Sequence, residues 1–179
     1  MKIIETPTMG ATPARDAAWT FYRETFAEIN TLAAQRHLMR HDEFTEVMTD
    51  GRITKYVLSE ENDALLGLGT STNDLSAWPL ISPAYFERMY PEQYAAGKLW
   101  YIGFIGVRDG VRGGFAAMLE AMSAPQRRVA GVALMDYCAF NFGERDVHSI
   151  SLRLLERYSA PRPRIVDTQT FVAYDFGER

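Results

Sequence analysis

The residues with the clearest chemical potential lie in a glycine-rich turn between two regular segments. Residues 99–107 form an apolar run rich in aromatic and β-branched side chains, which is typical of a buried strand. Residues 108–117 then contain three glycines and two arginines, and an amphipathic helical pattern follows. Unpaired amides at the start of a helix favour anions, and glycines let a ligand approach the backbone closely. The spacing therefore predicts a phosphate-binding turn, with an ordinary turn between a strand and a helix as the alternative interpretation.

This turn resembles the acyl-CoA-binding loop of the GNAT (GCN5-related N-acetyltransferase) superfamily. The family pattern is V-x-P-x-x-[QR]-x-x-G-x-[GA], and Val107, Arg112 and Ala117 match its valine, its arginine and its last small residue. Asp109 and Phe115 depart from the pattern, where the family has a proline and a glycine. The resemblance implies that strand groups hold the pantetheine arm of CoA and that turn amides hold its pyrophosphate. The residues implied in acetyl-CoA (CoA) binding are Ile105, Gly106, Val107, Arg112, Gly113, Gly114, Phe115, Ala116 and Ala117.

A second motif of the same family, N-x-x-A-x-x-L-Y-E-[KR], resembles residues 148–157. The matching residues are Ser151, Leu154, Glu156 and Arg157. His148 stands at the asparagine position and joins the residues implied in cofactor binding. Leu155 stands where many members carry the tyrosine that protonates the departing thiolate, and leucine has no proton to donate. Tyr158, one turn further, is therefore our candidate proton donor, with a tyrosine at the edge of the core as the alternative interpretation.

Tyr101 is a second candidate catalytic residue. It precedes Val107 by six residues, at the position where histone-type members of the family carry their catalytic glutamate. A tyrosine at this position would order a water molecule or orient the amine. The alternative interpretation is an aromatic side chain that packs on the face of the sheet.

The reaction implied by the resemblance is transfer of an acetyl group from acetyl-CoA to an amine by direct attack on the thioester. The acceptor would be a small-molecule or peptide amine. The altered turn and the missing tyrosine keep a second interpretation open, a GNAT-like protein that binds acyl-CoA or a partner with little or no catalysis. A third interpretation is an interaction protein whose aromatic segment, residues 73–98, forms the surface of a homodimer.

Other chemistries are less well supported by the spacing. His37 and His41 are four residues apart, but the glutamate of a zinc protease and a third ligand are missing, so we predict no metal site. A thiol hydrolase built on Cys138 is disfavoured because a lone cysteine in an apolar strand is usually inert. Residues 110–113 match the GxxG of KH nucleic-acid modules, but here a strand precedes the match.

Length and composition limit the class of protein. A chain of 179 residues fits one domain that covers residues 1–179. The net charge of −4 argues against nucleic acid as the main partner, and the single cysteine rules out an intrachain disulfide. The sequence shows no apolar run long enough for a signal peptide or a membrane span. We therefore expect a cytoplasmic protein with no membrane partner.

The elements that must position these motifs follow from periodicity and turn residues. We expect a strand over 2–6, a helix from Pro13 to about residue 39, and a shorter helix over 42–48. Residues 52–59 and 64–70 predict an antiparallel hairpin. After the strand over 99–107 we expect a helix from 113 that ends before Pro125, a strand over 129–139, a helix over 144–158 and a closing strand over 165–176.

This order, β-α-α-β-β-β-α-β-α-β, predicts an α/β (α+β) domain with a mixed, mostly antiparallel sheet. It is similar to the GNAT order, which implies that the central strands splay between residues 107 and 129 to admit the pantetheine arm. Segment 73–98 is rich in aromatic residues and prolines and is longer than most connections. We interpret it as a wall or lid on the acceptor side.

Overall fold

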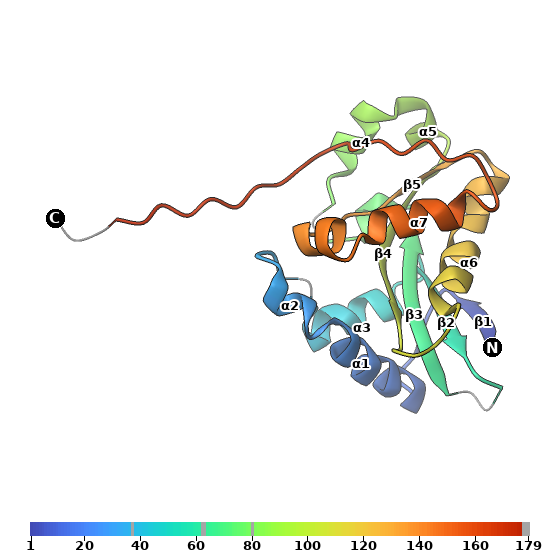
Figure 1. Cartoon of the computed structure of the whole chain (residues 1–179). Helices are drawn as coiled ribbons and strands as arrows, with labels where there is room; N and C mark the ends of the chain where they lie inside the picture. Colours follow the sequence, from blue (N-terminus) through green and yellow to red (C-terminus); the bar gives the residue numbers. More distant parts are fainter. Residues whose placement is uncertain (37, 62–63, 80, 177–179) are drawn as a thin grey trace.

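A mixed sheet forms the centre of the molecule (Figure 1). The computed structural model describes residues 1–36, 38–61, 64–79 and 81–176. The five strands are β1 (Lys2–Thr6), β2 (Thr54–Ser59), β3 (Leu65–Thr72), β4 (Leu99–Val107) and β5 (Val132–Leu134), and they lie side by side in this order. The pairs from β1 to β4 are antiparallel, and β5 is parallel to β4. This arrangement confirms the predicted mixed, mostly antiparallel sheet.

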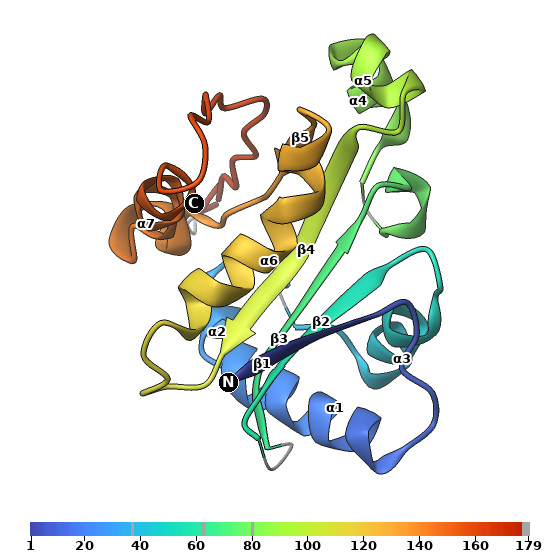
Figure 2. The ribbon, with the colours of Figure 1, turned by 90° about the vertical axis from the view of Figure 1, so that its right-hand side faces the viewer.

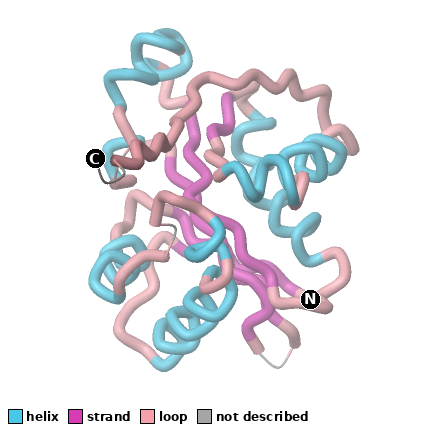
Figure 3. The backbone as a smooth tube through the Cα atoms, turned by 60° about the vertical axis from the view of Figure 1, so that its left-hand side comes forward, coloured by secondary structure: helices cyan, strands magenta, loops and turns pink. Residues whose placement is uncertain are grey.

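Helices cover both faces of this sheet. They are α1 (Pro13–Phe26), α2 (Ile29–Leu32), α3 (His41–Thr49), α4 (Pro83–Met89), α5 (Pro91–Ala95), α6 (Gly114–Arg128) and α7 (Val147–Leu155), with short helical turns η1 (Leu75–Ala77) and η2 (Phe140–Glu144). Figure 2 shows α6 and α7 on one side of the sheet and α1 and α3 on the other. Figure 3 shows the strands as a continuous band between the two groups of helices. Within the described residues, no helix has the length and apolar character needed to cross a bilayer.

The predicted hairpin is confirmed, and its alternating side chains divide the core in two. Tyr56 and Leu58 of β2 pack with Met118 and Met122 of α6. On the opposite face, Ile53, Val57 and Leu68 join a cluster built from α1 and α3. A strand whose neighbouring residues face opposite sides is buried on both faces only when helices cover both. The sheet is therefore a middle layer, as in the predicted α/β domain.

Lys55 is the one charged side chain of β2 and is fully buried. Its Nζ donates hydrogen bonds to the carbonyls of Pro7 (2.8 Å), Asp50 (2.6 Å) and Ile53 (2.7 Å). These acceptors satisfy all three N–H groups of the ammonium. Desolvation lowers the pKa of Lys55 to about 8, and the nearby Asp50 opposes this shift. The lysine joins the end of β1, the end of α3 and the start of β2.

The predicted ends of the first helix and of α6 were wrong. The first helix ends at Phe26 instead of about residue 39. The chain then folds back, so that Leu38 and Met39 pack on the α1 cluster and the Met39 amide donates to the Tyr22 hydroxyl (3.0 Å). A straight helix would carry these apolar residues about 20 Å beyond the core at ~1.5 Å per residue. Helix α6 in turn continues through Pro125 to Arg128, because a proline in the last turn costs only one helical hydrogen bond.

The predictions for the C-terminal third were also corrected. Strand β5 covers Val132–Leu134 rather than residues 129–139, and α7 covers Val147–Leu155 rather than residues 144–158. The predicted closing strand over 165–176 is not formed, because these described residues have no regular structure and pair with no strand of the sheet. The segment is rich in the β-branched and aromatic residues that favour strands, but a strand also needs the edge of another strand to pair with.

Candidate active site

The two parallel strands in the sheet separate soon after they meet. Their paired positions are Leu99 with Val132, Trp100 with Ala133, and Tyr101 with Leu134. Strand β4 continues for six further residues to Val107, whereas β5 ends at Leu134. Over residues 102–107, this edge of β4 is therefore not paired with β5. This divergence is the splay that the resemblance implied.

The backbone of β4 presents polar groups to this splay. The amide of Arg108 donates to a carbonyl of β3 at 2.8 Å. In an antiparallel ladder, alternate residues face the same neighbour, so Gly106 also faces β3 while Ile105 and Val107 face the opposite edge. Among the predicted cofactor-binding residues of β4, Ile105 and Val107 therefore have backbone groups directed to the splay. Gly106 instead lets α1 approach, since an added Cβ would lie 3.0 Å from the ring of Phe26.

A β-bulge lies where β4 leaves β5. Thr70 pairs with Phe104 and Ser71 pairs with Ile102, so Gly103 is an extra residue in β4. An added Cβ at Gly103 would lie only 2.2 Å from Cη2 of Trp78. The indole ring of Trp78 thus packs directly on the backbone of the bulge. Glycine is required here because no side chain fits under the ring.

The turn after β4 has an open, glycine-dependent backbone. Gly110 and Gly113 have φ values of 80° and 75°, in the left-handed region. A Cβ added to either residue would meet nothing within 4 Å, so their surroundings are open. Gly114 is different, because its added Cβ would lie 2.8 Å from a methyl of Val107. The first two glycines shape the turn, and the third allows α6 to pack against β4.

Several amides in this turn are free to bind an anion. The amides of Val111 and Gly114 donate to carbonyls within the turn, and the amide of Ala117 starts the helical pattern by donating to Gly113. In the described chain, the amides of Phe115 and Ala116 have no backbone acceptor. The side chain of Arg112 is exposed, and none of the described acidic residues forms an ion pair with it. The residues present therefore fit the pyrophosphate of CoA.

The phenol of Tyr101 lies at the point where the splay begins. Its hydroxyl donates to Oδ1 of Asp136 at 2.5 Å, and its ring lies 5.5 Å from that of Trp78. Burial raises the pKa of Tyr101 well above its usual range, and the negative charge of Asp136 raises it further. Asp136 is exposed, so one buried neutral phenol is joined to one accessible carboxylate.

Sequence reasoning did not predict the hydrogen bond between Tyr101 and Asp136. The signal for it is a polar residue directly after the apolar run 132–135, two residues beyond the end of β5. Its distance to Tyr101 depends on the register of the two strands, and local patterns do not contain that register.

The other predicted residues lie apart from this pair. Tyr158 is exposed beyond the end of α7, where the Arg127 guanidinium lies 5.0 Å from its ring. A hydrogen bond with Glu120 of α6 raises the pKa of Tyr158. His148 is half-buried in α7, where it stacks on Phe142 at 5.2 Å. The structure therefore joins Tyr158 to α6 and His148 to an aromatic cluster beyond β5, while Tyr101 pairs with Asp136.

The aromatic segment 73–98 folds as η1, α4 and α5 at one end of the sheet (Figure 1). Trp78 reaches the β4 bulge, and Phe86, Tyr90 and Tyr94 pack on a cluster around Leu99. The segment thus stands beside the start of β4 and β5. This position suits the predicted wall.

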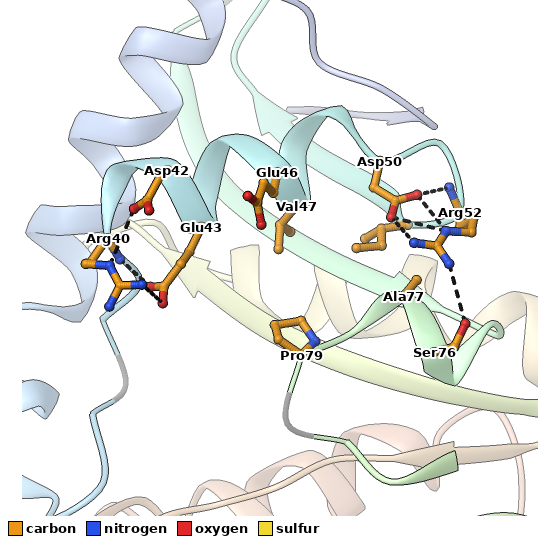
Figure 4. A pocket seen from close by; sticks show the side chains of 11 residues that line it. Arg40, Asp42, Glu43, Glu46, Val47, Asp50, Arg52, Ser76, Ala77 and Pro79 are labelled. Carbon is orange, nitrogen blue, oxygen red and sulfur yellow. Dashed lines mark hydrogen bonds and ion pairs between the residues drawn. The ribbon is translucent and has the colours of Figure 1, made fainter.

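A hollow of about 470 Å³ lies between α3 and η1 (Figure 4). Its lining is Arg40, Asp42, Glu43, Glu46, Val47, Asp50, Arg52, Ile53, Ser76, Ala77 and Pro79. Arg40 pairs with Glu43 (2.8 Å), and Arg52 pairs with Asp50 (2.6 Å). The bidentate bond from Arg36 and the amide of Arg40 lower the pKa of Glu43 to about 2. Most of the charge in this hollow is therefore neutralised by neighbouring side chains.

The possible metal pair has no support in the described chain, where no three His, Cys, Asp or Glu side chains gather around a common point. His41 packs edge-on against Trp19, with ring centroids 5.2 Å apart. His37 lies outside the described residues.

Comparison with solved structures identifies proteins that share this fold. No protein-family model and no curated protein matches the sequence. A mutant of the BH1408 protein from Bacillus halodurans matches with a TM-score of 0.56 and 14% identity, over 97% of this chain and 99% of that one. An aminoglycoside acetyltransferase from an uncultured soil metagenomic sample matches with a TM-score of 0.53 and 13% identity, over 96% of each chain. Tetrahymena GCN5 matches with a TM-score of 0.50 and 11% identity, over 82% of this chain and 77% of its own. The chain therefore has the fold of the GNAT acetyltransferases.

Proposed function

We propose that this protein is an N-acyltransferase that uses acetyl-CoA and an amine acceptor. The observation that carries the proposal is the divergence of β4 from β5 beside an open glycine turn at the start of α6. Ile105 and Val107 would hold the pantetheine arm through their backbone groups, and the amides of Phe115 and Ala116, which have no backbone acceptor in the described chain, would hold the pyrophosphate. Arg112 adds a charge-assisted contact to the phosphates.

Acetyl-CoA supplies an acyl group activated as a thioester. The chain's own contribution begins with Asp136, whose exposed carboxylate is open to an incoming ammonium group and can accept a proton from it. Tyr101 donates to Oδ1 of that carboxylate and thereby orients it. Because its pKa is raised, Tyr101 stays a neutral donor at physiological pH. We therefore assign Asp136 as the proton acceptor and Tyr101 as the residue that positions it.

We keep Tyr158 as the proposed proton donor to the thiolate, as a substitute for the tyrosine that the family carries at the position of Leu155. Free thiols have a pKa near ~8.5, so a thiolate leaves with only modest assistance. Loss of the donor should therefore slow the reaction without abolishing it. A Tyr158→Phe variant that keeps full activity would remove this residue from the mechanism.

The acceptor is proposed to approach past Trp78, which covers the bulge of β4. One solved structure with the same fold is an aminoglycoside acetyltransferase in complex with sisomicin, which supports the proposal of an acyltransferase. A small-molecule or peptide amine fits the proposal equally, and the protein is proposed to act without nucleic acid or a membrane partner.

The decisive experiment measures binding and turnover separately. Calorimetric titration with CoA tests the site, and release of free thiol from acetyl-CoA with a panel of amines tests the reaction. Binding together with amine-dependent thiol release is the expected result. Binding without release with any amine would favour the alternative, a GNAT-like acyl-CoA-binding protein. No binding would overturn the proposed function.

A further inference from the structure

An ion pair joins two distant parts of the chain across the splay between β4 and β5. The guanidinium of Arg145 donates a hydrogen bond to the carboxylate of Glu28, 117 positions earlier in the sequence. Glu28 lies between α1 and α2, whereas Arg145 directly follows η2. Figure 1 shows α2 opposite the η2 end of the orange helical segment. Between described residues, no other ion pair joins α1, α2 or α3 to the chain beyond β5.

Glu28 belongs to the margin of the splay that is formed by β4. The end of α1 packs directly on the diverging half of this strand, because an added Cβ at Gly106 would lie 3.0 Å from both Thr25 and Phe26. The rings of Phe26 and Phe104 also meet edge-on, with centroids 5.5 Å apart. Glu28 follows two residues after Phe26 and is exposed. Its carboxylate is therefore carried by a helix end that is fixed on β4.

Arg145 belongs to the opposite margin, which is the chain that continues from β5. Its amide donates to the carbonyl of Phe140 at 3.0 Å, and its guanidinium lies 5.2 Å from the centre of the Phe140 ring. Asp146, the next residue, has a φ of 51°, a conformation that few residues other than glycine adopt. These contacts hold Arg145 at the turn from η2 into α7. The two charges thus come from opposite margins of the splay.

The pair borders the face of the splay that carries the proposed acceptor wall. Phe26, Trp78 and Phe104 all pack against the core cluster of α1 and α3. Helix α6, whose first turn is the proposed phosphate site, covers the opposite face of the sheet (Figure 2). Trp78 covers the β4 bulge, and the end of α1 covers Gly106 further along the same strand. The indole and the ion pair therefore border one entrance to the splay.

We propose that Glu28 and Arg145 form a gate across this entrance, closed in the free protein and opened to admit the amine. The inference rests on the proposed function and adds a control of access to the same site. Side-chain exposures of 65% for Glu28 and 46% for Arg145 leave both groups free to turn into solvent. Exposed ion pairs are weak, so the closed form should be favoured by only about two- to five-fold. The gate therefore opens without unfolding of either margin.

The first test reverses the two charges singly and together. Glu28→Arg and Arg145→Glu each replace attraction by repulsion, so each should open the gate and raise kcat/KM for the amine by about three- to six-fold. The double variant rebuilds the pair with its charges exchanged and should return kcat/KM to the wild-type value. The matched control is Arg153→Glu, which breaks an ion pair with Asp146 that stays on one margin and should change nothing. Calorimetry should give the same affinity for CoA in all of these variants.

The directions of the changes separate a gate from simple attraction of a cationic amine. Attraction alone would lower kcat/KM in Glu28→Arg and raise it in Arg145→Glu, and this result would overturn the gate. Unchanged values in both single variants, or a double variant that does not return to the wild-type value, would overturn it as well. Absence of amine-dependent thiol release from the wild type would instead overturn the proposed function, and the gate with it.

The second test locks the gate. Glu28→Cys and Arg145→Cys, combined with Cys138→Ala to remove the natural thiol, allow a short bis-maleimide to join the two margins. The joined protein should lose about tenfold or more of its amine-dependent thiol release and keep its affinity for CoA. The control is the same variant treated with N-ethylmaleimide, which modifies both thiols without joining them. Equal turnover of the joined and control proteins would overturn the proposal.

Discussion

Tyr101 and Asp136 are joined by a 2.5 Å hydrogen bond across the point where β4 and β5 separate. The phenol is 5% exposed and belongs to the core, whereas the carboxylate is exposed to solvent. The bond thus fixes an accessible acid on the segment beyond β5 to the rigid strand beneath it. A carboxylate held in this way loses little rotamer freedom when an amine approaches.

The first prediction concerns this pair. Asp136→Asn should lower kcat by about 10²-fold or more, since an amide cannot accept the proton, while the affinity for CoA stays unchanged. Tyr101→Phe should lower kcat by about tenfold, because it frees the carboxylate without removing it. Steady-state thiol release measures both effects, with Glu87→Gln, an exposed carboxylate of α4, as the control. Full activity of Asp136→Asn would remove this residue from the mechanism.

The second prediction concerns the turn before α6. Arg112→Glu should weaken CoA binding by about 30-fold, because it removes a phosphate contact and adds repulsion. The matched control is Arg128→Glu, which makes the same charge change at the other end of α6. Calorimetry of the two folded variants compares them directly. Equal affinity for the two would locate the phosphates elsewhere.

The third prediction concerns the wall formed by Trp78. Trp78→Ala should raise the KM for the amine several-fold and leave the affinity for acetyl-CoA near that of the wild type. Gly103→Ala should act in the same direction, because its Cβ would lie 2.2 Å from the indole and must displace it. Trp78→Phe keeps a ring over the bulge and serves as the conservative control. A loss of acetyl-CoA affinity with an unchanged amine KM would contradict the assignment of this wall to the acceptor.

The fourth prediction is a pH dependence of stability caused by Lys55. Its pKa is lowered to about 8 in the folded protein, below the ordinary lysine value of 10.5, so between these values the unfolded chain binds a proton that the folded protein does not. The free energy of unfolding should therefore rise with pH from about 8 to about 10, by on the order of 2 kcal/mol. Above this window the ionisation of unfolded tyrosines opposes the effect, since burial raises the pKa of Tyr22 to about 12.

Urea unfolding at several pH values measures this slope, and Lys55→Met supplies the comparison. The variant should be less stable, because three carbonyls lose their donor, but its stability should not rise between pH 8 and 10. A parallel rise in both proteins would assign the slope to other groups.

The sequence by itself determined the elements whose causes are local. Alternating residues in β2 and β3 specify a hairpin that helices cover on both sides, and Gly110 and Gly113 specify a left-handed turn before α6. The turn that contains these glycines also carried the resemblance to the GNAT family, and that resemblance predicted the fold. These features depend on neighbours within a few residues, so a pattern of residue types is enough to identify them.

Only the tertiary structure decided which distant residues meet. Tyr101 and Asp136 are 35 positions apart, and their bond depends on the register between two parallel strands. Likewise, Trp78 lies on Gly103 only because β4 contains a bulge there. Residues 165–176 are rich in β-branched and aromatic side chains, yet these described residues pair with no strand of the sheet. Strand pairing and close packing are long-range, so residue types along the chain determine which segments can form strands, whereas tertiary contacts determine what they pair with.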